Sequence, residues 1–156
     1  MSPGTEVKIE GPFGNLTLHN NVARTAVLLA GGIGITPFRS MVFHAAKEKL
    51  AHRIVLFYSN RRPEDAPFLD ELHALEHVNP NYKLIATMTR MKDSAGAWRG
   101  ETGPIDEHML RRYLEGAISP IYYIAGPPAM VDGLREMVIK AGADSDDIRS
   151  EEFAGY

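Results

Sequence analysis

The sequence contains no cysteine. Disulfides, thiolate zinc sites, iron–sulfur clusters ligated by this chain and a cysteine nucleophile are therefore excluded. A chain of 156 residues can bury roughly 70% of the surface of its unfolded form, so it needs no cross-link to fold. The absence of cysteine is also typical of a reducing compartment, and we expect a cytoplasmic location.

Positive charge and long apolar runs are scarce as well. The 17 Lys and Arg residues against 20 Asp and Glu residues give a net charge of −3. Nucleic acid is therefore not expected as a partner, because binding to it depends on basic surfaces. No apolar run approaches the roughly 20 residues of a membrane span, and residues 1–6 do not resemble the start of a signal peptide. We expect neither membrane insertion nor secretion.

The chain alternates between two kinds of apolar pattern. Short, continuous apolar runs predict strands that are buried on both faces, at residues 26–30, 54–58, 84–88 and 121–125. Helical spacing predicts amphipathic helices between them, with the apolar stripes Phe38, Met41, Val42, Ala45 and Ala46; Phe68, Leu69, Leu72 and Leu75; Met109, Leu110, Tyr113 and Leu114; and Met130, Leu134, Met137, Val138 and Ala141. Gly142 is suited to end the last helix, and residues 148–153 predict a final strand.

This alternation predicts an α/β fold with a doubly wound, mostly parallel five-stranded sheet over residues 21–156. Residues 1–20 differ, because apolar and polar residues alternate there on both sides of a glycine turn. We expect a short N-terminal β-ribbon in this segment. Ligands of doubly wound sheets bind beyond the carboxyl ends of the strands, so the candidate segments are 31–37, 59–63, 89–103 and 126–130.

The strongest motif is Gly31-Gly32-Ile33-Gly34-Ile35-Thr36-Pro37, which lies between a predicted strand and a predicted helix. Glycines let the backbone approach a pyrophosphate, whose charge is attracted by free N–H groups at the start of the helix. A tight turn without a ligand is the alternative. Pro37 departs from the Rossmann fingerprint, and the Lys of a P-loop is absent. We expect Gly34→Val to abolish dinucleotide binding and to leave the fold intact.

Further motifs follow in order along the chain: Gly11-Pro12-Phe13-Gly14, Tyr58-Ser59-Asn60-Arg61, Gly126-Pro127-Pro128-Ala129-Met130 and a terminal Glu-x-Phe. Together with the glycine loop, they resemble the nicotinamide-nucleotide domain of the ferredoxin-NADP reductase family. The resemblance covers essentially the whole chain. Ala125 departs from it, because the family usually carries Cys at this position, and the rate of hydride transfer is therefore open.

The resemblance implies that a dinucleotide lies across the strand ends and passes a hydride to the flavin of a neighbouring β-barrel. Candidate catalytic residues are Thr36, near the nicotinamide, and Glu152, Phe153 and Tyr156 at the end of the chain. The implied cofactor-binding residues are Gly31, Gly32, Gly34, Ile35, Thr36, Pro37, Ser59, Asn60, Arg61, Thr89, Arg90, Gly126, Pro127, Pro128 and Met130. No metal site is expected.

The flavin-binding motifs of that family, Arg-x-Tyr-Ser/Thr and a second phosphate loop, do not occur in this sequence. Residues 1–20 resemble only the last ribbon of a flavin-binding barrel. The resemblance therefore implies that FAD is supplied by a flavin-binding domain of a longer polypeptide or by a separate protein. Ferredoxin or another electron carrier is the expected acceptor. The alternatives are a module that senses NAD(P) without turnover and a scaffold with an inactive site.

Hydroxyl and guanidinium groups follow two of the predicted strands, in Ser59-Asn60-Arg61-Arg62 and in Thr89-Arg90. A ribose 2′-phosphate is bound by Arg, whereas a 2′-hydroxyl is bound by a carboxylate. The sequence therefore favours NADP slightly over NAD. The alternative is that these arginines are solvated or form ion pairs with Glu64 and Asp65.

Three side chains near the predicted site have two interpretations each. Trp98, in the long loop 91–103, covers either the adenine or the edge of the core. Phe153 either docks on the sheet or contacts the flavin. Glu152 either assists at the nicotinamide or is a solvated carboxylate.

His73-Ala74-Leu75-Glu76-His77 fits a zinc-binding pattern. The apolar stripe of the predicted helix leaves both histidines toward solvent, and the spacing suggests no third ligand. We therefore expect no metal there, and we expect the remaining histidines at the surface, namely His19, His44, His52 and His108. No Gly-x-Ser-x-Gly motif occurs, so a serine hydrolase is not supported.

Overall fold

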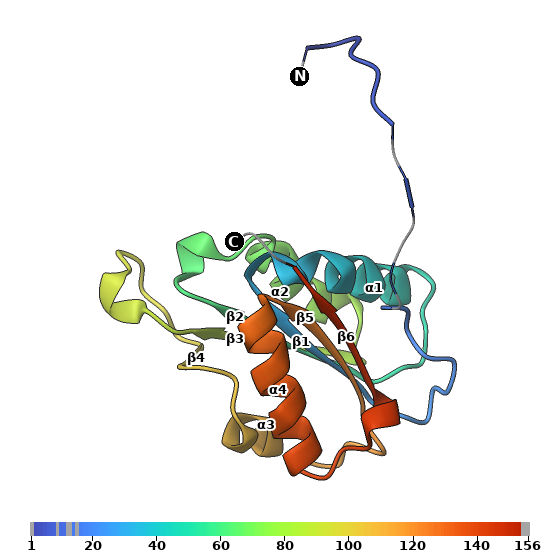
Figure 1. Ribbon diagram of the computed structural model, residues 1–156. Helices are drawn as coiled ribbons and strands as arrows, with labels where there is room; N and C mark the ends of the chain where they lie inside the picture. Colours follow the sequence, from blue (N-terminus) through green and yellow to red (C-terminus); the bar gives the residue numbers. More distant parts are fainter. Residues whose placement is uncertain (1, 9, 12–13, 15, 154–156) are drawn as a thin grey trace.

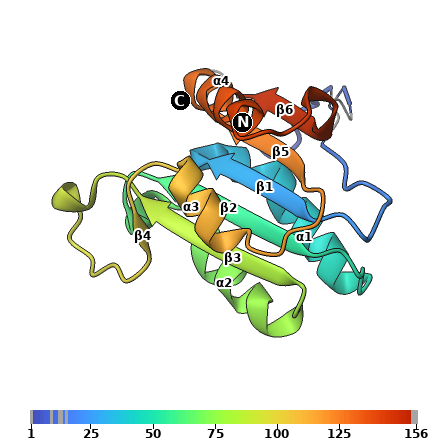
Figure 2. The same cartoon turned by 90° about the horizontal axis from the view of Figure 1, so that it is seen from below.

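The computed structural model describes residues 2–8, 10–11, 14 and 16–153. A six-stranded sheet runs through the domain in the order β4-β3-β2-β1-β5-β6 (Figure 2). Its strands are β1 (Ala26–Gly31), β2 (Ile54–Asn60), β3 (Tyr82–Met88), β4 (Glu101–Thr102), β5 (Ile121–Gly126) and β6 (Ile148–Glu152). Every pairing is parallel, so the predicted fold class is confirmed. The predicted count of five strands is wrong by the two-residue β4, which is too short to leave a periodic pattern.

Helices cover both faces of the sheet (Figure 1). They are α1 (Ile35–Lys47), α2 (Leu69–Val78), α3 (Glu107–Tyr113) and α4 (Pro128–Lys140). Alternate residues of each strand serve the two halves of the core, so that Leu28 and Tyr123 pack with α1 and α2, whereas Leu29 and Ile124 pack with α3 and α4. Each such side chain, when fully buried, contributes about 1.5–3 kcal/mol of stability relative to an exposed one. This two-sided burial explains why the strands read as continuous apolar runs.

The strand order reverses next to β1. From β1 the chain adds β2, β3 and β4 in one direction, and it then returns to place β5 on the other side of β1. The loops after β1 and β5 therefore diverge at the carboxyl edge of the sheet, which is where doubly wound folds bind their ligands. Gly31, Asn60 and Gly126 are the last residues of their strands and lie at this edge.

Two predictions about local structure are wrong. The described part of residues 1–20 contains no strand, because an isolated ribbon without neighbouring strands is marginal. Its first residues extend away from the domain (Figure 1), whereas Leu16 and Leu18 pack against the core. Phe68 does not join the core stripe of α2, since it precedes the helix in a left-handed conformation and is 42% exposed. Its ring lies under the Arg39 guanidinium, 4.8 Å away.

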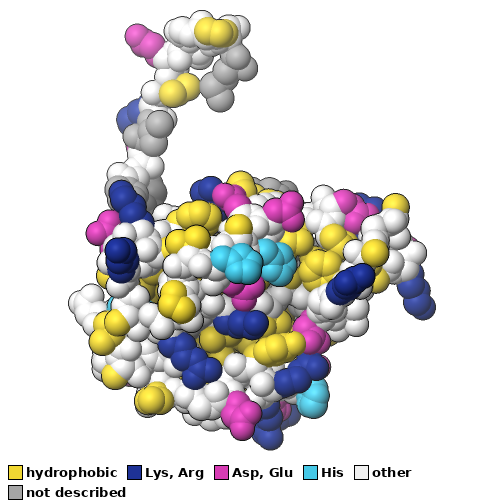
Figure 3. All heavy atoms as spheres, turned by 180° about the vertical axis from the view of Figure 1, so that it is seen from behind, with side chains coloured by type: hydrophobic (Ala, Val, Ile, Leu, Met, Phe, Trp, Pro, Cys, Tyr) yellow, Lys and Arg dark blue, Asp and Glu magenta, His cyan; other side chains and the backbone are white. Residues whose placement is uncertain are grey.

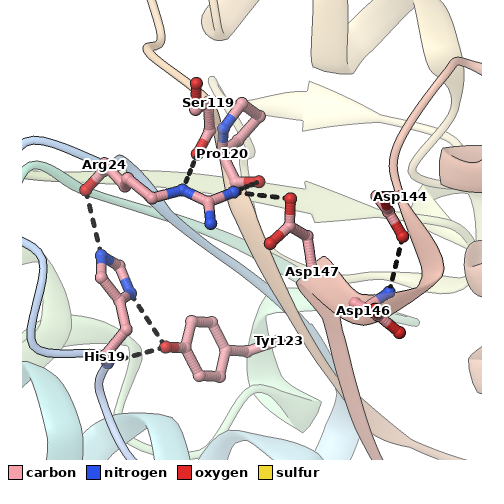
Figure 4. A network of polar contacts seen from close by, with 8 residues as sticks. All are labelled: His19, Arg24, Ser119, Pro120, Tyr123, Asp144, Asp146 and Asp147. Carbon is pink, nitrogen blue, oxygen red and sulfur yellow. Dashed lines mark hydrogen bonds and ion pairs between the residues drawn. The ribbon is translucent and has the colours of Figure 1, made fainter.

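Buried histidines at the opposite edge of the sheet are a further correction. The backbone N–H of His19 donates to the Tyr123 hydroxyl at 2.9 Å, and its ring bonds both that hydroxyl and the Arg24 carbonyl oxygen (Figure 4). The His52 ring donates to the His19 carbonyl oxygen at 2.7 Å. Long-range partners of this kind leave no trace in the sequence. His44 and His108 are exposed, as predicted.

Candidate nucleotide-binding site

A cavity of about 550 Å³ opens at the carboxyl edge of the sheet, beside the point where the strand order reverses. The predicted residues that line it are Gly31, Gly32, Ser59, Asn60, Arg61, Thr89, Arg90, Pro127 and Met130. Arg62, Asp65 and Asp93 complete the lining and were not among the predicted site residues. Four strand ends thus contribute to one concave surface of ligand-binding size.

The backbone at Gly32 is open to this cavity. A β-carbon built at Gly32 would meet no atom within 4 Å, and the residue has φ +52°, a left-handed conformation that favours glycine. At Gly31, by contrast, a β-carbon would clash with the Met130 sulfur and lie 3.2 Å from the Pro127 ring. Of these two glycines, Gly32 is therefore the one whose backbone is open to the cavity.

Gly34 has a structural role instead. A β-carbon there would lie 2.7 Å from the Gly126 nitrogen and closer still to the Ala125 carbonyl group. Gly34 therefore permits the turn after β1 to pack on the end of β5, and the expectation that Gly34→Val leaves the fold intact is wrong. Ile35 is likewise fully buried, so that its side chain belongs to the core.

Other predicted residues surround the cavity without lining it. Thr36 is exposed in the first turn of α1, where its hydroxyl donates to the Ile33 carbonyl oxygen at 3.1 Å. Pro37 follows in that same turn, and Pro128 opens α4, both positions that suit proline. Gly126 packs against β1, because a β-carbon there would lie 3.2 Å from the Gly31 carbonyl oxygen.

Polar groups of the β2 and β3 ends face the cavity. Thr89 and Arg90 are tied to the β2 end through backbone bonds to the Asn60 and Arg61 carbonyl oxygens, at 2.9 and 2.8 Å. The Thr89 hydroxyl also donates to the Asn60 carbonyl oxygen. The side-chain nitrogen of Asn60 is buried, and the Asn60 side chain interacts with the Tyr58 hydroxyl, which opposes the rise in the pKa of Tyr58 that burial causes.

Guanidinium groups give the cavity its charge. Arg62 binds Asp65 with two hydrogen bonds of 2.8 Å and lies 3.6 Å from Glu64. This bond to Arg62 lowers the pKa of Asp65, and the bond to Asp65 raises the pKa of Arg62. The Arg90 side chain forms no ion pair or hydrogen bond with any residue that the structure describes. The predicted pairing of arginines with Glu64 and Asp65 thus holds for Arg62.

The C-terminal residues adjoin the site through β6. The Phe153 backbone N–H donates to the Gly126 carbonyl oxygen at 2.9 Å, and its ring packs against the core. The predicted docking of Phe153 on the sheet is therefore confirmed. Glu152 is exposed, and Tyr156 lies outside the described residues. Neither Glu152 nor Phe153 lines the cavity.

Trp98 lies on the other side of β3. Its indole N–H donates to the Glu101 carbonyl oxygen at 2.7 Å, and its ring covers Gly100. With Leu84 and Tyr113 it borders a separate hollow at the sheet edge. The described geometry therefore favours the core-edge interpretation over contact with the adenine.

The histidine pair on α2 lies at the surface. His73 and His77 are both exposed, as predicted, and histidine side chains are visible on the surface in Figure 3. Within the part of the chain that the structure describes, no group of three or more His, Asp or Glu side chains is arranged to hold a metal ion. Among the same residues, no helix is long and apolar enough to cross a membrane.

Comparison with known proteins identifies similar sequences and folds. The family described as an oxidoreductase NAD-binding domain matches residues 28–136. A subunit of the Na⁺-translocating NADH-quinone reductase of Methylococcus capsulatus is 30% identical, over 99% of this chain and 39% of its own length. The reductase component of propane 2-monooxygenase of Rhodococcus jostii is 26% identical, over 98% of this chain and 42% of its own.

A solved structure shows the same fold. The ferredoxin reductase in carbazole 1,9a-dioxygenase superimposes with a TM-score of 0.72 and 26% identity, over 92% of this chain and 42% of its own. The present chain spans less than half of the length of each of these relatives.

Proposed function

This chain belongs to the family of oxidoreductase NAD-binding domains, and we propose that it binds NAD(P)H and presents the nicotinamide to a flavin. The flavin would be FAD, held by a neighbouring domain or a separate protein. The reduced flavin would pass electrons to ferredoxin or another carrier. The relative from Methylococcus is one subunit of a quinone reductase, and the relative from Rhodococcus is the reductase component of a monooxygenase, which supports a partner of this kind.

The cavity carries this proposal. Its wall at Gly32 is open backbone, and its β2 and β3 ends carry Arg61 and Arg90. A pyrophosphate fits the open backbone near the start of α1, because free N–H groups and the helix dipole attract anions. Adenosine phosphates fit the guanidinium groups, which bind phosphate oxygens in pairs.

The residues of this chain would act by positioning. A bound nicotinamide supplies the hydride chemistry, and the protein contributes orientation. We propose that Thr36, exposed at the start of α1, lies beside the nicotinamide, with Pro127, Pro128 and Met130 at the start of α4. Glu152, Phe153 and Tyr156 are proposed to border the flavin side of the site.

NADPH is the proposed cofactor of choice by a small margin. Arg90 lines the cavity without an ion-pair partner among the described residues and follows Thr89, which provides a hydroxyl. A 2′-phosphate would gain a charge-assisted hydrogen bond from that guanidinium. The margin is small because carboxylates share the same cavity.

Calorimetric titration of the chain with NADP⁺, NAD⁺ and FAD tests the proposal. We expect binding of both nicotinamide dinucleotides, tighter for NADP⁺, and none of FAD. Failure of both to bind at millimolar concentration would contradict the proposal. Mixing the chain with its flavin-binding domain then separates the two remaining functions, since electron transfer from NADPH to an artificial acceptor supports the reductase, and binding without turnover supports a sensing module.

A further inference from the structure

The Arg62–Asp65 pair lies inside the cavity, where a bound nucleotide would meet it. Both residues belong to the turn that follows β2, and both line the nucleotide-binding cavity. Their side chains meet through two hydrogen bonds of 2.8 Å, a bidentate geometry that leaves the Arg62 fork occupied.

The surroundings hold this pair in place. The Asp65 backbone N–H donates to the Arg62 carbonyl oxygen, which closes the turn. Glu64 lies 3.6 Å from Arg62 and accepts a hydrogen bond of 2.9 Å from the Ser94 hydroxyl, which belongs to the loop after β3. Asp93 adds a further negative charge that acts on Arg62. The positive charge of Arg62 is thus already balanced by carboxylates.

The three cavity arginines are therefore not equivalent. Arg90 has no ion-pair partner among the described residues, and Arg61 interacts with Asp65 only through its charge. Arg62 could bind a phosphate only by leaving Asp65. A ligand phosphate would compete with a carboxylate that is already in bidentate contact, so most of its gain would be cancelled.

We propose that Asp65 determines cofactor specificity by holding Arg62 away from the ribose 2′-phosphate. This inference rests on the proposed function and deepens it. With Asp65 present, the Arg90 guanidinium favours NADPH, and the chain accepts both cofactors. Without Asp65, the Arg62 fork turns to the 2′-phosphate, and NADPH is strongly preferred. The chain would still bind nicotinamide dinucleotides, and only its preference between NADPH and NADH would change.

The test compares Asp65→Ala with Asp93→Ala by calorimetry with NADP⁺ and NAD⁺. Both variants remove one negative charge from the cavity lining, but only Asp65→Ala releases the hydrogen-bonded guanidinium. We expect Asp65→Ala to tighten NADP⁺ binding by about three- to tenfold, less than a buried charge-assisted hydrogen bond would give, because the pair is partly exposed. NAD⁺ binding should change by less than about twofold, and Asp93→Ala should give a smaller shift in the ratio of the two affinities.

A double variant tests whether Arg62 causes the shift in the ratio of the two dissociation constants. If Arg62 causes the shift, Asp65→Ala combined with Arg62→Ala should return the ratio of the two dissociation constants to near the wild-type value. Circular dichroism of each variant confirms that the fold is intact. An unchanged ratio in Asp65→Ala, an equal shift in Asp93→Ala, or a ratio that changes because NAD⁺ weakens would each overturn the inference. The last result would mean that Asp65 binds the ribose hydroxyls directly.

The wild-type titration separates this inference from the proposed function. If wild type binds either dinucleotide and the Asp65→Ala ratio does not move, only the role of Asp65 is rejected. If wild type and all variants bind neither dinucleotide, the proposed function and the role of Asp65 are rejected together.

Discussion

Gly34→Ala should destabilise the fold, whereas Gly32→Ala should weaken cofactor binding. The two glycines belong to the same motif and differ in what faces their α-carbons. At Gly34 the neighbours are the Ala125 carbonyl group and the Gly126 nitrogen, both backbone atoms at the end of β5. That strand pairs with β1 on one side and β6 on the other, so its backbone cannot move aside.

The magnitudes follow from these surroundings. Overpacking a core costs about 1–3 kcal/mol, and a clash with fixed backbone belongs at the upper end, near 3 kcal/mol for Gly34→Ala. At Gly32 a β-carbon meets nothing within 4 Å, so only the left-handed backbone opposes alanine, at about 1–2 kcal/mol. With a urea m value of about 1.5 kcal/mol per molar, the unfolding midpoint should fall by about 2 M for Gly34→Ala and by about 1 M for Gly32→Ala.

Urea unfolding and calorimetry together decide the assignment. Circular dichroism gives the midpoints, and titration of each folded variant with NADP⁺ gives the affinity. Gly32→Ala should weaken NADP⁺ by at least about tenfold, equivalent to about 1.4 kcal/mol, because its methyl group enters the cavity wall. Gly34→Ala should bind within about threefold of wild type. A Gly34→Ala variant with the wild-type midpoint and no NADP⁺ binding would refute this reasoning and assign Gly34 to the ligand.

Three further predictions concern Arg90, the titration of His19 and Trp98 in the loop after β3. Arg90→Ala should weaken NADP⁺ by about tenfold and leave NAD⁺ unchanged in calorimetry, while Arg99→Ala on the same loop changes neither; equal losses for both cofactors would show that Arg90 does not contact the 2′-phosphate. Burial lowers the pKa of His19, so the His19 ring is neutral in the fold. The stability that neutral His19 contributes is present above about pH 6.5, and it is lost as the pH falls through the lowered pKa of the folded state. Urea unfolding across pH 4–8 should show this loss, and His19→Gln should flatten the curve; equal slopes for both proteins would contradict the role of His19. Trp98→Ala should lower the unfolding midpoint and leave NADP⁺ affinity unchanged. A loss of affinity at a constant midpoint would instead indicate that Trp98 contacts the adenine.

The fold was predictable where burial acts on whole segments. Strands enclosed on both faces must be apolar throughout, and helices against them must carry one apolar stripe, so β1, β2, β3, β5 and the four helices leave strong patterns. Phe68 shows the limit of this reasoning. Its spacing fits the stripe of α2, but the left-handed turn before the helix directs the ring to Arg39 on α1. A periodicity cannot locate the first residue of a helix to within one residue.

The candidate site was predictable in location and less so in detail. Glycines after two buried strands mark the carboxyl edge of the sheet, because the backbone must turn there and stay accessible to a ligand. The motif could not tell which glycine faces a ligand and which faces a neighbouring strand, since that depends on how the β1 and β5 turns pack on each other. Asp93 was missed for a similar reason, because only the folded loops bring it to the arginines of the cavity, whereas Asp65 was anticipated as an ion-pair partner but not as a residue that lines the cavity.

The distribution of residues around the cavity also fits the proposed transfer of a hydride to a flavin held by a partner. The charged residues that line the cavity come from the β2 and β3 ends, which suit the adenosine phosphates, whereas Thr36 and Phe153 lie beyond the cavity lining, near β1 and β6. In the proposed binding mode, the chain alone would surround one end of an extended dinucleotide and leave the other end on an open surface. A hydride donor must be accessible on one face to meet its acceptor. Transfer to a separately held flavin would therefore need an exposed nicotinamide end, and an enclosed adenosine end would hold the dinucleotide in position.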